Sequence, residues 1–178
     1  MNNLRSIIFP LVVGIIVIFT HLNLFALVVG DTVENVTIWD ANNNPTELPD
    51  FGKKVLVIFY NDPDVSSQND PFADLLKKKK LNKSKYRPIG IANCKDTWKP
   101  NMIIRMVIRK KVEKYKSTIL IDTDQKLKKT WKIGNCNEKS VIIVIGKDKK
   151  VYYFNKGPIE PESEREKVVK LIKDLMDK

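Results

Sequence analysis

Two apolar patterns predict where the strands of this chain lie. Residues 33–40 alternate between apolar and polar side chains, as a strand with one buried face does. Residues 55–60 are apolar without alternation, which is typical of a central strand covered on both faces by helices. Further strands are predicted at residues 86–92, 118–121, 141–145 and 151–154. The last two flank a short turn, so we expect them to form an antiparallel hairpin.

Helices are expected between and after these strands. The first begins at Asp70, an N-cap that is followed by Pro71 in the first helical position. The second follows a loop at residues 93–100. Its inner face is predicted to carry Ile103, Met106, Val107 and Val112. A brief helix precedes the hairpin, and Pro161 begins the last one.

The order of these elements predicts an α/β fold. Right-handed crossovers bring the middle strands together as a parallel group, and the hairpin adds antiparallel strands at one edge. Helices then cover both faces of the sheet. The expected architecture is a thioredoxin-like three-layer α/β/α fold with a mixed central sheet and an insertion before the hairpin. Such a fold by itself assigns no function.

The first 26 residues have the order of a secretory signal peptide. Arg5 precedes an apolar run of about 13 residues at 7–19, and a cleavage site is expected near residues 24–26. A helix that spans a bilayer needs about 20 such residues, so a cleaved signal fits better than an anchor. An uncleaved anchor that continues through residues 27–29 is the alternative. We expect the thioredoxin-like domain, residues 27–178, to lie in the periplasm or another extracytoplasmic compartment.

Charge and histidine content narrow the function. The chain carries 32 basic and 21 acidic residues, and without Arg5 the domain keeps 31 basic against 21 acidic. This excess allows weak association with an anionic membrane, whereas nucleic acid is not an expected partner of an exported protein. The single histidine, His21, lies in the predicted signal peptide. The domain therefore lacks the residue that serine triads, cysteine–histidine dyads and histidine-based zinc sites require.

Several stretches of the chain resemble a known family. The most specific are residues 131–133 and 137–151, which contain a tryptophan, an acidic bend with a serine, a run of branched residues and a lysine/aspartate turn. Residues 30–33, 85–87 and 157–162 add weaker support. In these features the chain resembles the YtfJ family, periplasmic thioredoxin-like proteins of uncertain function, over roughly residues 30–177. The resemblance implies a periplasmic thioredoxin-like protein and supplies no reaction.

The redox motif of thioredoxins is missing from this chain. In active members the loop after the central strand holds C-x-x-C at a helix N-terminus, where the helix dipole lowers the pKa of a thiol. The corresponding positions here are Asp64, Val65, Ser66 and Ser67. A serine hydroxyl cannot exchange disulfides, and the proline that usually precedes the next strand is absent from residues 137–140. Standard thioredoxin activity is not expected, and neither is a cofactor.

Two cysteines remain, Cys94 and Cys136, and the predicted topology brings both to the same end of the sheet. A structural disulfide between them would suit an exported protein. Their parent strands flank a central one, so both cysteines would have to lean inward to reach the Cα separation of about 4.4–6.8 Å that a disulfide needs. Separate, partly buried thiols and a switchable redox pair are the other two interpretations.

The loop after the central strand, Asn61, Asp62 and Pro63, is the candidate partner-binding site. Asp62 and Asp64 with Asn61 have the chemistry of a calcium site, but a tight turn prefers the same residues, so we expect no metal. The leading hypothesis is a non-catalytic binding module of the periplasm or cell envelope, whose partner is an envelope protein or peptide. The alternative is a weak thiol-disulfide oxidoreductase or redox sensor that uses Cys94 and Cys136.

Overall fold

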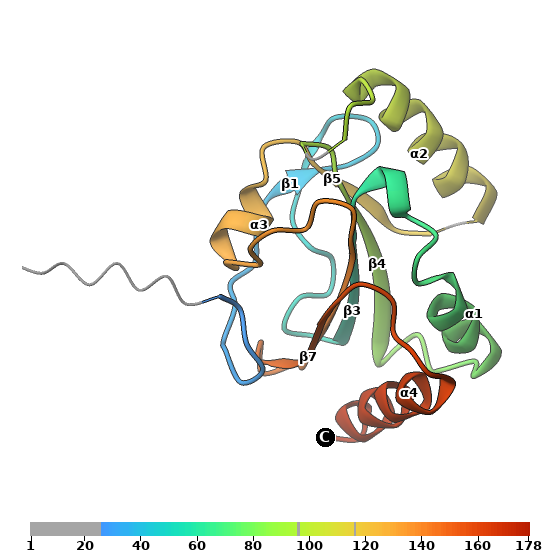
Figure 1. Ribbon diagram of the computed structural model, residues 1–178. Helices are drawn as coiled ribbons and strands as arrows, with labels where there is room; N and C mark the ends of the chain where they lie inside the picture. The colour runs from blue at the N-terminus through green and yellow to red at the C-terminus, as the bar shows by residue number, and fades with distance from the viewer. Residues whose placement is uncertain (1–25, 96, 116) are drawn as a thin grey trace, which may run out of the picture.

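The computed structural model describes residues 26–178 apart from 96 and 116, and a seven-stranded sheet forms its centre (Figure 1). The strands lie in the order β2-β1-β5-β4-β3-β6-β7. Their bounds are β1 Ile38–Trp39, β2 Pro45–Thr46, β3 Val55–Asn61, β4 Tyr86–Asn93, β5 Ile119–Asp122, β6 Ser140–Ile145 and β7 Val151–Lys156. The helices are α1 Asp70–Lys78, α2 Asn101–Tyr115, α3 Lys126–Thr130 and α4 Glu162–Met176, with a 3-10 turn, η1, at Pro63–Val65. The predicted α/β class is confirmed.

Strand β3 is the interior strand that the continuous apolar run predicts. It pairs in parallel with β4 and antiparallel with β6, so it has a neighbour on each side. Its first four residues are fully buried, because the chain covers both faces of the sheet here. Strand β4 pairs in parallel with β5, and β6 pairs with β7 as the predicted antiparallel hairpin. The sheet is therefore mixed, as expected.

The two faces of the sheet are covered by different elements. On one face, α1 and α4 pack on β3 and β6 through a cluster that includes Phe72 and Ile172. Helix α2 covers β5 on that same face, where Ile104 and Ile108 meet the strand. The opposite face is covered by α3, with Leu127, and by the segment before β1. In Figure 1 α1, α2 and α4 accordingly lie across the sheet from α3, which confirms the three-layer arrangement.

Helix α2 packs with a different face from the predicted one. Ile104 and Ile108 are buried against the sheet, and Val112 is partly buried beside them. The structure exposes Ile103, Met106 and Val107 at 45%, 46% and 45% of their surface. The prediction for these three residues was wrong, because apolar side chains at helical spacing occur on both sides of this helix.

The amino-terminal part of the fold also differs from the expectation. The strand predicted at residues 33–40 is reduced to β1, which pairs with β5 and with the unpredicted strand β2. At α1, Asn69 occupies the cap position that was assigned to Asp70, and its side chain makes no capping hydrogen bond. The side chain of Asn69 is instead used in the tertiary contacts described below.

The predicted signal peptide, residues 1–26, lies outside the described residues except for Ala26. Within the described part of the chain, every helix is too short or too polar to cross a bilayer.

Candidate functional site

A buried carboxylate joins two loops at the carboxyl end of β3. Asp62 is 1% exposed, and its Oδ1 accepts a hydrogen bond from the backbone N–H of Asp64 at 2.9 Å. Its Oδ2 accepts from the backbone N–H of Glu138, also at 2.9 Å. The backbone N–H of Asp62 donates to the carbonyl of Lys139 at 3.2 Å. Asp62 thus ties the loop after β3 to the loop before β6, and both its oxygens are engaged by backbone donors, as in a turn.

A second polar cluster lies beside it. The hydroxyl of Ser140 donates to Oδ1 of Asn61 at 2.6 Å, and Nδ2 of Asn69 donates to that hydroxyl oxygen at 2.9 Å. Nδ2 of Asn69 also donates to the carbonyl of Gly157 at 3.0 Å, and its Oδ1 accepts from the backbone N–H of Ile159 at 2.9 Å. Asn69 and Ser140 are buried, so these bonds satisfy groups that water does not reach. Neither residue belongs to the site predicted from the sequence.

The positions of the missing C-x-x-C lie between the end of β3 and the start of α1. Asp64 and Val65 belong to η1, and Ser66 and Ser67 follow it. Asp64 forms an ion pair with Lys99 and accepts a hydrogen bond from Oγ1 of Thr97 at 2.9 Å. The hydrogen bond from Lys99, with that from Thr97, lowers the pKa of Asp64 below its ordinary value. Asp64 therefore links this loop to the segment before α2.

Cys94 and Cys136 are both buried thiols, and no disulfide joins them in this structure. Cys94 directly follows β4 and belongs to the cluster under α2, whereas Cys136 belongs to the cluster on the opposite face of the sheet. Burial, with a smaller opposing effect of Arg105, raises the pKa of Cys94 to about 11. The thiol of Cys94 is thus protonated at neutral pH, and a protonated thiol is a poor nucleophile.

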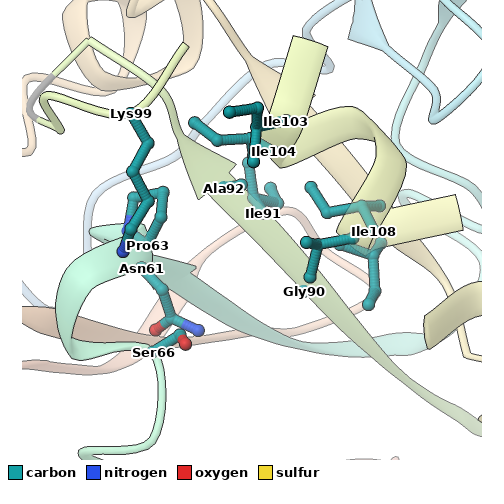
Figure 2. A pocket seen from close by; sticks show the side chains of 12 residues that line it. Asn61, Pro63, Ser66, Gly90, Ile91, Ala92, Lys99, Ile103, Ile104 and Ile108 are labelled. Carbon is teal, nitrogen blue, oxygen red and sulfur yellow. The ribbon is translucent and has the colours of Figure 1, made fainter. Parts of the chain in front are cut away.

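An apolar groove opens between η1 and α2 (Figure 2). Its cavity volume is about 310 Å³. One wall consists of Asn61, Pro63 and Ser66, and Lys99 lies at the same end. Isoleucine and valine side chains of α2 form the opposite wall. The candidate partner-binding residues Asn61 and Pro63 therefore line a cavity, whereas Asp62 is buried in the loop contacts behind it.

The floor of the groove is strand β4, which presents small residues to it. Gly90 and Ala92 are partly exposed, while Ile91 between them is buried. A second hollow of about 390 Å³ shares Gly90 with the first and runs toward the other end of β4. A Cβ atom at Gly90 would lie 3.5 Å from the side chain of Ile119, an ordinary contact. Small side chains, and not a strained backbone, thus keep the groove open.

The described residues contain no group of three histidine, cysteine, aspartate or glutamate side chains placed to hold a metal ion. The conceivable calcium ligands, Asp62 and Asp64, make the backbone, Thr97 and Lys99 contacts given above. The arrangement places an apolar groove beside a hydrogen-bonded polar loop, and that loop contains no thiol.

Comparison with solved structures shows which fold this is. A peroxiredoxin-like protein from Aquifex aeolicus matches with a TM-score of 0.59 and 15% identity, over 85% of this chain and 89% of that one. A thiol-disulfide isomerase from Corynebacterium glutamicum matches with a TM-score of 0.60 and 11% identity, over 84% and 97%. The pneumococcal exposed lipoprotein thioredoxin Etrx1 from Streptococcus pneumoniae matches with a TM-score of 0.57 and 15% identity, over 80% and 100%. The fold is thioredoxin-like and related to that of thiol-disulfide oxidoreductases.

Comparison of the sequence identifies the family. No curated protein matches the chain. A family model described as "Bacterial protein of unknown function (YtfJ_HI0045)" matches residues 48–175, which include β3, the groove, helices α1 to α3 and all but the last residue of α4. The chain therefore belongs to the YtfJ family of bacterial proteins, and within that family it has a thioredoxin-like fold.

Proposed function

We propose that this protein is an exported, non-catalytic binding module of the periplasm or cell envelope. It binds an apolar segment of a protein or peptide partner in the groove between η1 and α2. One observation carries the proposal: the groove opens beside the loop in which thioredoxin-like enzymes hold C-x-x-C, and this loop contains no cysteine.

Two features of the groove support binding over catalysis. Its walls are mostly apolar, and a few polar groups stand at one end, namely Asn61, Ser66 and Lys99. Ligand sites typically combine these two elements. The polar groups that lie behind the loop are satisfied internally by Asp62, Asn69 and Ser140. The loop is thus held in place by these hydrogen bonds, and it contains no thiol to activate.

The redox alternative depends on Cys94 and Cys136, and three observations weigh against it. Both side chains are buried, they belong to clusters on opposite faces of the sheet, and the pKa of Cys94 is raised to about 11. Thiol-disulfide exchange requires an accessible thiolate. We therefore place the binding function first.

A disulfide-reduction assay separates the two functions. We expect the protein to leave the background rate of disulfide reduction by dithiothreitol unchanged, and Cys94→Ser and Cys136→Ser to behave as the wild type. Robust turnover that either substitution abolishes would establish the oxidoreductase instead.

Binding is tested by a photo-crosslinking amino acid placed at Ser66, in the groove wall, and at Lys173, an exposed position on α4, as the matched control. We expect a specific adduct with an envelope protein from Ser66 alone. The purified partner should then bind the wild type and lose affinity about tenfold or more with Gly90→Leu, whose side chain fills the groove floor. Equal adducts from both positions, or full affinity of Gly90→Leu, would contradict the proposal.

A further inference from the structure

Most of the exposed large apolar side chains of the described residues gather around the first half of α2. Trp98 is 84% exposed and Met102 77%, and Ile103, Met106 and Val107 are each close to one half exposed. Elsewhere in the described residues only Val28 and Val29 are large, apolar and exposed. We call the first five side chains, Trp98, Met102, Ile103, Met106 and Val107, the α2 patch. A cluster of this kind marks a surface that contacts another molecule or a membrane.

Part of the α2 patch lies on the side of α2 away from the sheet. With 3.6 residues per turn, Met102 and Met106 lie on one side of the helix, and Ile104 and Ile108 lie on the opposite side. The latter two are buried against the sheet. The helix is therefore held in place by Ile104 and Ile108. Met102 and Met106 lie on its outer side, whereas Ile103 and Val107 lie between the two sides and also line the groove.

The segment that carries the patch is strongly basic. Residues 94–115 contain seven basic residues and two acidic ones. Among the described side chains, Lys95, Arg109 and Lys110 are exposed, and Arg109 and Lys110 flank the patch one turn beyond Met106. Long basic side chains next to apolar ones can keep their charges at an anionic surface while the apolar groups enter it.

We infer that the α2 patch docks this protein on an anionic phospholipid surface, with α2 lying in the plane of the membrane interface. A helix with one apolar side and flanking Lys/Arg residues binds such surfaces, and tryptophan is favoured at the boundary between lipid and water. Ile103 and Val107 also line the groove, but Trp98, Met102 and Met106 do not. The inference rests on these three side chains and does not depend on the proposed binding function.

The shape and charge of the patch favour lipid over a second copy of the chain and over an acidic peptide. Trp98 and Met102 project from the surface, and a fluid lipid layer accepts projecting side chains without a matching cavity. Two copies that met patch to patch would bring together two segments, each with five more basic than acidic residues, which repel each other. An acidic peptide would complement the charge, but ligand sites are typically concave, and Trp98 and Met102 line no part of the groove.

The fluorescence of Trp98 in the full chain provides a local test. Emission would be measured with vesicles of phosphatidylcholine containing about 30% phosphatidylglycerol, and with phosphatidylcholine alone. A Trp98→Phe variant supplies the signal of Trp39 and Trp131 for subtraction. We expect a blue shift with anionic vesicles and quenching by brominated lipid. Both should be lost with neutral vesicles and in about 0.5 M salt, where charge interactions are screened.

Two pairs of substitutions separate the patch from other means of attachment. Met102→Ser with Met106→Ser should weaken the Trp98 response about tenfold or more, and Arg109→Glu with Lys110→Glu should do the same. Lys77→Glu with Lys78→Glu reverses the same number of charges at exposed positions on α1 and should respond as the wild type does.

Three results would overturn the inference. The first is a Trp98 signal that vesicles leave unchanged. The second is a response that neutral vesicles reproduce in full or that the methionine substitutions leave intact. The third is burial of Trp98 without lipid, either by an added acidic peptide or by dimerisation in sedimentation equilibrium.

Discussion

Asp62 stabilises the loop in which related enzymes hold their dithiol. Its carboxylate accepts hydrogen bonds from the backbone N–H groups of Asp64 and Glu138, which are 74 positions apart (138 − 64) in the sequence. Backbone donors that are buried need acceptors, and a carboxylate with two oxygens serves two of them. Asp62 therefore contributes to the shape of the candidate site through structure rather than chemistry.

Asp62→Asn is expected to destabilise the fold by about 1–3 kcal/mol. The amide keeps one acceptor oxygen, and its NH₂ group would face the N–H of either Asp64 or Glu138. The free energy of unfolding from urea denaturation measures the effect.

Asp64→Asn is the matched control, two positions along the same loop. Asp64 pairs with Lys99 in an exposed setting, and exposed ion pairs contribute little to stability. Equal losses for Asp62→Asn and Asp64→Asn would show that the buried bonds of Asp62 add nothing to the stability of the loop.

The sequence predicted the location of this loop but not the residues that fix it. The run at residues 55–60 identified the central strand, so the residues after it, from Asn61 on, could be assigned to the site. Asn69 and Ser140 could not be assigned to the site, because they contact each other across 71 positions of sequence and belong to no recognisable motif. Local patterns carry no information about such pairs.

At the scale of elements, α2 shows why helical periodicity is ambiguous. Ile104, Ile108 and Val112 form one stripe at i, i+4, i+8, and the α2 patch forms a second one at similar spacing. Both satisfy the rule for an amphipathic helix, so the sequence alone could not decide which stripe packs on the sheet. The structure assigns the first to the core and leaves the second exposed.

Alanine substitutions on the two sides of α2 should therefore differ. Ile104→Ala removes a side chain that is 5% exposed and should cost about 2–4 kcal/mol of unfolding free energy. Met106→Ala removes one that is 46% exposed and should change stability by no more than about 0.5 kcal/mol. Urea denaturation of both variants checks this, and a larger loss for Met106→Ala would restore the orientation that the sequence predicted.

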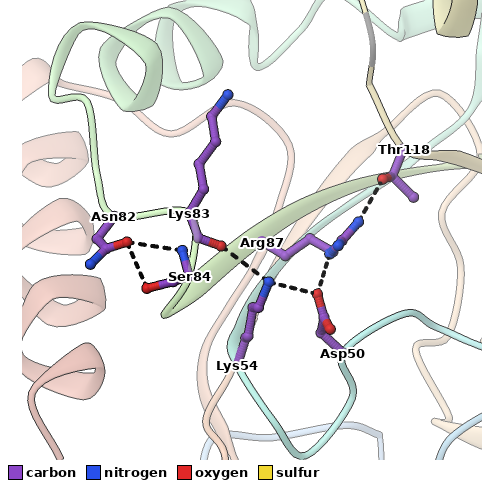
Figure 3. Close-up of polar contacts among 7 residues, drawn as sticks. All are labelled: Asp50, Lys54, Asn82, Lys83, Ser84, Arg87 and Thr118. Carbon is purple, nitrogen blue, oxygen red and sulfur yellow. Dashed lines mark hydrogen bonds and ion pairs between the residues drawn. The ribbon is translucent and has the colours of Figure 1, made fainter.

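A polar cluster lies at the starts of β3, β4 and β5, at the opposite end of the sheet from the groove (Figure 3). Oδ2 of Asp50 accepts from Nε of Arg87 at 2.6 Å and from Nζ of Lys54 at 3.0 Å. Arg87, on β4, also donates to Oγ1 of Thr118 at 3.2 Å, just before β5. One carboxylate thus connects the starts of three parallel strands, far from the groove end of the sheet.

This cluster should make stability depend on pH in the acid range. The hydrogen bonds from Lys54 and Arg87 lower the pKa of Asp50 in the folded protein. Its contribution is therefore complete above the unfolded pKa of about 3.9, and it is lost as the pH falls through the lower folded pKa. The stability advantage of the wild type over Asp50→Asn should be constant near neutral pH and shrink below about pH 4.

Urea midpoints measured from about pH 7 to pH 3 would show this narrowing. Asp74→Asn serves as the control, because Asp74 pairs with Lys77 at an exposed position on α1. If the stability difference between the wild type and Asp50→Asn is as independent of pH as the difference for Asp74→Asn, the Asp50 cluster has no part in acid unfolding.

At the scale of the whole molecule, the topology followed from the sequence more completely than the details did. The order of the strands was predictable because right-handed crossovers and a short hairpin leave few arrangements open. Strand β2 was not predictable. Its two residues, Pro45 and Thr46, carry no strand pattern, and they pair only because β1 lies beside them. The groove was equally hidden, because it depends on two small residues of β4, Gly90 and Ala92, that lie between η1 and α2.

The two cysteines report on the opening of the whole domain. Cys94 and Cys136 are 6% and 0% exposed, so a thiol reagent reaches them only when the surrounding clusters open. The raised pKa of Cys94, about 11, further lowers its thiolate fraction below that of an ordinary cysteine. Ellman's reagent should therefore label the native protein slowly at neutral pH, at a rate that rises with urea along with global unfolding.

In denaturant without reductant, Ellman's reagent should titrate both thiols of the chain. A rapid reaction in the native state would indicate a reactive redox cysteine, and no titratable thiol in denaturant would indicate a disulfide between Cys94 and Cys136.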